Sequence, residues 1–373
     1  MDDNIVLFRQ NFFALSETFI QSQAGAMTRH NPIYVSRFRI KDPVMDVKSF
    51  SLQSYQSKIQ DRIFSSTGHS TAFTGLLRDV GARLIHAHFG PDGMLALPAA
   101  KAISVPLVVT LHGRDVTVKP SQLLKTGKPV AARYALTRKR IMRQASKVLC
   151  VSNDLKRKAL DQGFDEENIV THYIGIDTQK FAFSNSVREA RFIHVARLVE
   201  KKGTSNLLHA FAKISSRNPD SVLDIVGDGP LRASLEEQAR NLGISRQTIF
   251  HGPLSNVEVR GMLKRSAAFV LPSVTAGNGD REGLPISILE AMSSGTPVIS
   301  TFHSGIPEAI PTDSQGLLVD EHDVLGLSER MHAVLNDAGF AQQLGTNGAE
   351  FVRKNFDLVK QTEELERIYD ELF

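Results

Sequence analysis

Residues 192–203 read FIHVARLVEKKG, a short apolar run followed by a charged turn that ends on glycine. A helical pattern begins directly after this turn, near Thr204. A strand that leads into a helix in this way is the repeating unit of parallel α/β layers. The stretch therefore predicts a strand, a turn and a helix, with the charged turn at the carboxyl end of the strand.

The same alternation occurs on both sides of this stretch and fills the 373-residue chain. Further apolar runs expected to form strands are residues 5–8, 33–35, 84–88, 107–110 and 148–151, then 223–226, 248–250, 269–271, 298–300 and 316–319. Helical patterns between them include 16–28 and 130–145. Two such sets predict an α/β protein of two Rossmann-like, doubly wound domains that face each other across a cleft. The polar stretch 183–187 marks the expected boundary, between domains 1–183 and 184–355.

Composition places the chain among globular proteins, since 42% of its residues are hydrophobic and 23% are charged. Disordered and collagen-like classes are excluded. The single cysteine, Cys150, excludes a disulfide scaffold and is expected to be buried and unreactive. The most apolar stretch, 94–111, is interrupted by two prolines and a lysine, and no basic leader opens the chain. We therefore expect a cytoplasmic protein, either free or peripheral on the inner face of a membrane.

Basic residues are concentrated in one segment. Residues 114–158 contain 13 Lys or Arg and two acidic residues, whereas the rest of the chain contains 31 basic and 38 acidic residues. Such a segment suits an anionic membrane surface. A solvated helix face is the alternative. Nucleic acid is not expected as a partner, because no aromatic residues are interleaved with the basic ones.

The segment GDREGLPISILEAM (279–292) is the most informative for function. Pro285 is expected at the first position of a helix that runs to Ser293, so Glu282 lies in the loop before it and Glu290 in its second turn. The helix N-terminus suits a phosphate group, and a carboxylate such as Glu290 suits the vicinal diol of a ribose. The alternative explanation is structural: one glutamate would be an acid near the helix N-terminus that interacts favourably with the helix dipole, and the other a solvated surface residue.

Other strand ends carry residues suited to a nucleotide ligand. Arg197 and Lys202 flank the turn after residues 192–195 and are expected to hold a diphosphate. The glycine turns 227–230 and 252–254 either approach a base or are plain turns. Neither a Gly-x-Gly-x-x-Gly fingerprint nor a P-loop occurs, which disfavours dehydrogenases and P-loop phosphotransferases. The pair at 86 and 88 lacks a third metal ligand, so no metal cofactor is expected.

Taken together, these motifs resemble the retaining glycosyltransferases of family 4, which have the GT-B fold, and among them the exopolysaccharide and colanic-acid biosynthesis enzymes. The Glu282–Glu290 pair matches the E-x7-E motif of that family. The segments that narrow the resemblance are SETF (16–19), HAHFG (86–90), DREG (280–283) and HSGIPE (303–308). The resemblance also implies that the last helix, within 356–373, crosses back to the N-terminal domain.

The resemblance implies roles for particular residues. The expected catalytic residues are His112, Glu282, Arg197 and Lys202. The expected donor-binding residues are Arg197, Lys202, Gly229, Leu254, Glu282, Gly283, Leu284, Ile286 and Glu290. The acceptor side is expected to involve Ser16, Glu17, His88 and Asp115. Many members have a glycine-rich loop after the first strand, but residues 9–15 contain no glycine, so this loop suits the acceptor as well as the donor.

The implied activity is transfer of a hexose from a nucleoside-diphosphate sugar, with retention and without a metal, to a lipid-linked or oligosaccharide acceptor in exopolysaccharide biosynthesis. A transferase that glycosylates a small molecule, such as an aminocyclitol, would share all the donor motifs. A non-catalytic subunit that binds a nucleotide sugar is the alternative of another class. The donor base, the sugar and the oligomeric state are not fixed by the sequence.

Overall fold

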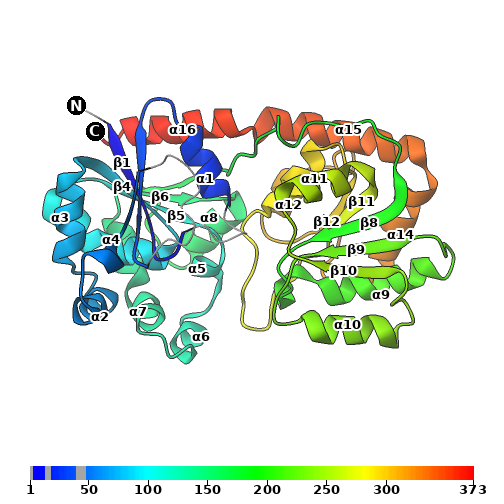
Figure 1. Cartoon of the computed structure of the whole chain (residues 1–373), viewed down its shortest axis with the longest axis horizontal. Helices are drawn as coiled ribbons and strands as arrows, with labels where there is room; N and C mark the ends of the chain where they lie inside the picture. The colour runs from blue at the N-terminus through cyan, green and yellow to red at the C-terminus, as the bar shows by residue number, and fades with distance from the viewer. Residues whose placement is uncertain (1–2, 13–17, 39–47) are drawn as a thin grey trace. The chain divides into compact units, whose positions relative to one another are not determined.

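The computed structural model describes residues 3–12, 18–38 and 48–373. The chain divides into two compact units, one made of residues 1–175 with 358–373 and the other of residues 176–357 (Figure 1). Each unit contains a sheet of parallel strands with helices between them. The prediction of two Rossmann-like α/β domains is confirmed.

The first unit has a seven-stranded sheet over its described residues, in the order β3-β2-β1-β4-β5-β6-β7. Its strands are β1 (Asn4–Arg9), β2 (Asn31–Ser36), β3 (Ser49–Ser51), β4 (Ala82–His88), β5 (Leu107–Leu111), β6 (Lys147–Cys150) and β7 (Ile169–Thr171). Its helices are α1 (Thr18–Gly25), α2 (Lys58–Thr67), α3 (Thr71–Asp79), α4 (Gly90–Ile103), α5 (Arg114–Thr117), α6 (Pro120–Lys125), α7 (Pro129–Gln144), α8 (Asn153–Asp161) and α16 (Leu358–Asp370).

The second unit has a six-stranded sheet in the order β10-β9-β8-β11-β12-β13, all of it within the described residues. Its strands are β8 (Glu189–Val195), β9 (Val222–Val226), β10 (Thr248–Gly252), β11 (Ser266–Leu271), β12 (Val298–Thr301) and β13 (Leu317–Val319). Its helices are α9 (Thr204–Ser215), α10 (Arg232–Asn241), α11 (Asn256–Arg265), α12 (Ile286–Ser293), α13 (Ile306–Ala309), α14 (Val324–Asn336) and α15 (Ala338–Asn355).

The strands were predictable because parallel sheets covered on both faces need continuous apolar runs. All the runs expected to be strands are strands, and Ile5, Val6, Leu7 and Phe8 of β1 are almost fully buried. Two short strands, β3 and β7, were not predicted. Both lie at edges of the first sheet. Cys150 is buried at the end of β6, as expected.

Helix ends differ from the predictions by a few residues. Helix α1 ends at Gly25 rather than Thr28, and α7 spans Pro129–Gln144. The sequence predicted Pro285 as the first residue of its helix, and this prediction is wrong, because Pro285 is the residue before the helix. Its ψ of 116° is extended, so α12 begins at Ile286. Among the described residues, no helix is long and apolar enough to cross a membrane.

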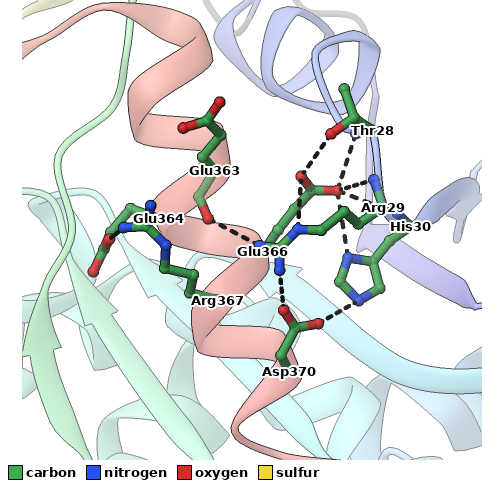
Figure 2. A network of polar contacts seen from close by, with 8 residues as sticks. All are labelled: Thr28, Arg29, His30, Glu363, Glu364, Glu366, Arg367 and Asp370. Atoms are coloured by element: carbon green, nitrogen blue, oxygen red, sulfur yellow. Dashed lines mark hydrogen bonds and ion pairs between the residues drawn. The ribbon is translucent and has the colours of Figure 1, made fainter.

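Helix α16 packs on the first unit, where Leu365, Ile368 and Tyr369 join the core beside β1 and β4. A second contact is polar, and it centres on the fully buried Glu366 (Figure 2). One carboxylate oxygen accepts hydrogen bonds from the backbone N–H groups of Thr28 (3.0 Å), Arg29 (2.8 Å) and His30 (3.2 Å). The turn before β2 therefore binds the terminal helix through three consecutive backbone donors.

Candidate functional site

Polar side chains gather at the carboxyl ends of the strands in both units. Within each sheet the strands are parallel, so their carboxyl ends meet at one edge. This is the edge at which α/β proteins bind ligands. In the second unit the loops after β8, β11, β12 and β13 meet there, and in the first unit those after β1, β4 and β5.

The cluster in the second unit is centred on Glu282, in the loop between β11 and α12. Its side chain is only 9% exposed, with Oε2 3.0 Å from Nζ of Lys202 and Oε1 3.6 Å from Nζ of Lys201. Burial alone would raise the pKa of Glu282, but the two ammonium groups outweigh it and lower that pKa to about 2. Glu282 is therefore ionised at neutral pH and paired with both lysines.

Lys201 is a member of this cluster that the sequence analysis missed. Its Nζ donates to Oδ1 of Asp280 and to the carbonyl oxygen of Arg281, both at 3.2 Å. Burial would lower the pKa of Lys201, but Glu282 and Asp280 raise it. The adjacent lysines of the turn were the available signal, although their sequence does not say which of them reaches the acidic loop.

Gly203 brings the lysine turn against the loop after β11. It has a φ of +63°, and a Cβ there would lie 1.8 Å from the carbonyl oxygen of Pro272. Only glycine allows both the left-handed backbone and this close approach. The short turn 200–202 therefore ends where both lysines can reach the Glu282 loop.

Glu290 lies in the second turn of α12, as predicted. Its side chain is half-buried, and no hydrogen bond or ion pair joins its carboxylate to any described residue. Burial raises the pKa of Glu290 to about 7. A poorly solvated carboxylate that lacks a protein partner has its full capacity to accept hydrogen bonds left for a ligand.

The other expected donor-side residues lie around this cluster. Gly283 and Leu284 are buried beside Glu282, and Ile286 begins α12. Arg197 lies just past β8 with an exposed side chain, which makes no hydrogen bond or ion pair within the described part of the chain. A diphosphate clamp of Arg197 with Lys202 therefore remains a proposal.

The glycine turn after β9 has a packing role. A Cβ on Gly229 would lie 2.4 Å from the carbonyl oxygen of Leu198, and the Leu198 N–H donates to the Asp228 carbonyl at 2.9 Å. The turn after β9 therefore packs directly on the turn after β8. Leu254 is half-buried in the turn that follows the next strand, β10. Contact of Gly229 and Leu254 with a nucleotide remains a proposal.

In the first unit, Asp115 fixes the turn that carries His112. The buried Asp115 carboxylate accepts hydrogen bonds from the N–H groups of Gly90 (3.0 Å), His112 (3.1 Å) and Gly113 (3.0 Å). Burial raises the pKa of Asp115 to about 6, although these hydrogen bonds oppose the shift. Asp115, expected on the acceptor side, is thus bonded to the backbone beside His112.

His112 also contacts His88, which was predicted from the neighbouring strand. Nδ1 of His88 lies 3.2 Å from Nε2 of His112, and the Phe89 ring packs against His112 with centroids 4.4 Å apart. Burial holds the pKa of both imidazoles well below its usual range, so both are neutral at neutral pH. Nε2 of His88 is buried and makes no hydrogen bond to any described residue.

The loop after β1 begins with side chains bonded to α4. Arg9 Nη1 lies 2.7 Å from Oδ2 of Asp92, and Gln10 Nε2 donates to Oδ1 of Asp92 at 2.7 Å. The Arg9 guanidinium also stacks 4.1 Å above the Phe89 ring. The sequence analysis named this loop but not the Arg9–Asp92 pair. The acceptor-side predictions Ser16 and Glu17 lie outside the described residues.

Comparison with known proteins agrees with this architecture. The family model "Glycosyltransferase Family 4" matches residues 46–180, and "Glycosyl transferases group 1" matches residues 176–351. The chain belongs to glycosyltransferase family 4.

Two curated relatives of this family 4 chain come from polysaccharide pathways. It is 31% identical over 252 residues to the putative colanic acid biosynthesis glycosyltransferase WcaL of Escherichia coli, covering 66% of this chain and 60% of the relative. It is 30% identical over 254 residues to the amylovoran biosynthesis glycosyltransferase AmsK of Erwinia amylovora, with the same coverage of 66% and 60%. The chain thus matches about 60% of the length of these relatives.

A solved structure shows the same GT-B fold. Anabaena HepE, in complex with UDP and glucose, superposes with a TM-score of 0.81 at 18% identity and with 99% of each chain covered. This likeness confirms the fold class predicted for the family 4 chain. Among its described residues, no group of three His, Cys, Asp or Glu side chains is arranged to hold a metal ion.

Within this family 4 chain, the predicted site residues fall into two groups. Glu282 and Lys202 are in contact in the second unit, close to the start of the helix that carries Glu290. His88, His112 and Asp115 form a second bonded group in the first unit. Residue types at strand ends pointed to Glu282, Glu290, Lys202 and His112, whereas His88 and Asp115 were expected only from the family resemblance. The contacts within each group required the structure.

Proposed function

We propose that the chain transfers a hexose from a nucleoside-diphosphate sugar to a lipid-linked or oligosaccharide acceptor in exopolysaccharide biosynthesis, with retention of anomeric configuration. The names of the relatives WcaL and AmsK support the pathway. HepE, which shares the fold, is solved with UDP and with UDP-glucose, which supports a nucleotide-sugar donor. The observation that carries the proposal is the Lys201–Lys202–Glu282 cluster, next in sequence to a helix with an unpartnered Glu290.

The chemistry follows from where charge develops. When the bond between C1 of the sugar and the phosphate oxygen breaks, negative charge grows on the leaving diphosphate. Lys202, Arg197 and the N-terminus of α12 are the positive groups that stabilise it. The acceptor oxygen forms its new bond to C1 on the same face, and its proton passes to the leaving phosphate. These cations perform the task without a metal, so EDTA should leave turnover unchanged.

Substitution of the two cations tests this assignment. The double variant R197A/K202A should bind acceptor normally but lower kcat by roughly 10²- to 10³-fold, because each group acts mainly on the transition state. A panel of UDP-, GDP- and ADP-sugars in thermal-shift assays first identifies the donor, and chromatography then follows its conversion. K213A removes an exposed cation of α9 and serves as the control. Near-normal turnover in the double variant would disprove leaving-group stabilisation by this pair.

The same assays separate the other candidates. Donor hydrolysis without acceptor shows an enzyme and rejects a non-catalytic binding subunit. Transfer to a free aminocyclitol in preference to lipid-linked saccharide would favour the small-molecule transferase.

A further inference from the structure

His303 is a buried histidine outside the set of residues considered so far. It follows β12, has no exposed surface, and belongs to the segment 303–308 that the sequence analysis used only for the family resemblance. Its ring lies between two acidic loops. Nδ1 is 2.6 Å from Oε1 of Glu321, and Nε2 is 3.2 Å from the backbone nitrogen of Glu282.

The contacts determine which ring nitrogen carries the proton. The backbone N–H of Glu282 can only donate, so Nε2 of His303 must accept and be unprotonated. Nδ1 therefore carries the hydrogen and donates it to Glu321. Glu321 is itself held by the Thr275 N–H (2.7 Å) and the Thr275 hydroxyl (3.2 Å). The ring is thus fixed in one neutral tautomer by a carboxylate that is fixed in turn.

The residues after His303 hold the other side of the same peptide segment. The Ser304 hydroxyl donates to the Glu282 carbonyl at 2.6 Å, and the Gly305 N–H donates to the Gly283 carbonyl at 3.1 Å. The loop 272–285 forms no helix or strand, so its backbone position depends on contacts of this kind. Together they place the Glu282 side chain against the two lysines.

We propose that His303, oriented by Glu321, is a positioning residue of the donor site, which fixes the Glu282 peptide so that its carboxylate meets the donor sugar. This inference rests on the proposed function and on the donor-binding role that the family resemblance implies for Glu282. A shift of about 1 Å at such a group can lower the rate by roughly 10²-fold. Loss of a residue that orients a metal ligand typically costs about 10- to 100-fold, and we expect a loss of similar size here. His303 does not itself touch the substrate.

The arrangement makes the site sensitive to acid. A protonated ring would direct an N–H of Nε2 at the Glu282 N–H, and the hydrogen bond would be lost. Burial and Arg281 hold the pKa of His303 below its usual range, against the opposing effects of Glu321 and Glu282. In E321Q the carboxylate that favours the imidazolium is gone, so the pKa of His303 should fall further. The pH at which kcat decreases on the acidic side of its pH profile should then be lower than in wild type.

The experiment uses the donor sugar that the thermal-shift panel identifies, and its nucleoside diphosphate (UDP, GDP or ADP) as the binding probe. It measures kcat, KM and the affinity for this probe across pH for H303Q, H303F, E321Q and wild type. In H303Q the amide oxygen accepts from Glu282 but does not titrate, so part of kcat should remain and the decrease of kcat at low pH should flatten. H303F, which has no acceptor, should lose about 10- to 100-fold in kcat with the affinity for the nucleoside diphosphate nearly unchanged. H332Q, at an exposed histidine of α14, is the matched control and should behave as wild type.

Retention of wild-type kcat in H303F, or an unaltered decrease of kcat at low pH in both H303Q and E321Q, would overturn the proposal. Ring-nitrogen NMR of the wild-type protein provides a test that needs neither turnover nor a folded variant. An Nδ1–H tautomer of His303 supports the proposal, and an Nε2–H tautomer rejects it. If wild type showed no activity toward any nucleotide sugar, the proposed function would be wrong. The NMR result does not depend on activity, so the two failures can be told apart.

Discussion

At the scale of single residues, Glu290 shows a conflict between stability and binding. Its carboxyl is largely removed from water and has no described partner, and burial raises its pKa to about 7. Because the pKa is higher in the folded than in the unfolded chain, the protonated carboxyl stabilises the fold at pH values below the unfolded-state pKa. This stability is lost as the pH rises through about 7. The protein without ligand therefore tolerates an acid that only a hydrogen-bond donor, such as a ribose diol, would satisfy.

Glu290→Gln should accordingly have opposite effects on stability and binding. Above pH 7 the variant should melt at a higher temperature than wild type, because no buried carboxylate has to ionise. Its affinity for the nucleotide should fall about 10-fold or more, since hydrogen bonds to a charged acceptor contribute about 1.5–3 kcal/mol. Calorimetric titration and melting curves measure the two effects. E350Q, at an exposed site of α15, is the control, and an unchanged nucleotide affinity in E290Q would refute the ribose assignment.

Sequence reasoning selected Glu282, Glu290 and Lys202 as candidate site residues, because they lie near predicted strand ends and are of the types that bind a diphosphate or a diol. The roles of Lys201 and His303 do not follow from such reasoning, because their contacts depend on how the irregular loop 272–285 lies against the turns after β8 and β12. Sequence periodicity carries no information about such loop-to-loop contacts.

At the scale of elements, the docking of α16 joins an apolar face to one buried charge. Burial would raise the pKa of Glu366, but the hydrogen bonds from Arg29 and Thr28 outweigh it and lower that pKa below its usual 4.5. Because the pKa is lower in the folded than in the unfolded chain, the ionised carboxylate stabilises the fold at pH values above the unfolded-state pKa. This stability is lost as the pH falls through the folded-state pKa. Asp370 of the same helix adds contacts to Arg29 and to Nε2 of His30 (3.2 Å) (Figure 2).

Glu366→Gln should therefore destabilise the protein by about 2 kcal/mol at neutral pH. The amide oxygen can still accept from the three backbone N–H groups but carries no charge, and the amide NH2 would face the Arg29 guanidinium in place of Oε2. The difference from wild type should shrink as the pH falls below 4.5. Chemical denaturation at several pH values measures it. The control is E364Q, at an exposed acid of the same helix that is paired with the exposed Arg367 (Figure 2). Because exposed ion pairs contribute little, E364Q should change stability little. Equal effects of both variants would contradict the role of the three backbone donors.

The elements that the sequence revealed are those with a strong apolar signal. Central strands such as β1 and β5 are buried on both faces, so they appear as unbroken apolar runs. The edge strands β3 and β7 have three residues each and contain serine or threonine, so no comparable signal exists. The family resemblance implied the helix that is α16, but its binding to the turn at 28–30 depends on a contact between residues more than 330 positions apart in sequence.

At the scale of the whole molecule, the chain passes from one unit to the other twice, and the two connections lie side by side. The Ile176 N–H donates to the Phe356 carbonyl at 2.9 Å, and the Thr178 hydroxyl donates to Asp357 at 2.6 Å. The two family models meet at the same place, since one ends at residue 180 and the other begins at residue 176. The boundary between the two compact units thus lies where the two family models meet.

A lipid-linked acceptor would require the molecule to work at a membrane surface, and the first unit offers a basic face for it. On α7, Leu136, Lys139, Arg140 and Arg143 are all exposed and follow helical spacing, so they share one side of the helix. Arg138, which the sequence analysis counted with this basic group, does not belong to it. It is buried and donates to the Val118 carbonyl at 3.3 Å.

The variant K139Q/R140Q should bind anionic vesicles about 30-fold more weakly than wild type, because each basic residue contributes about 1 kcal/mol at such a surface. Pelleting with phosphatidylserine vesicles at low and high salt measures this binding, and salt should weaken it as the charges are screened. R353Q/K354Q removes the same charge from exposed positions of α15 and should pellet as wild type does. Equal losses in both variants would show that net charge alone causes binding to the vesicles. Wild-type binding that does not depend on lipid charge would disprove the proposed binding to an anionic membrane. Selective loss in the α7 variant would place the first unit against the membrane through this helix.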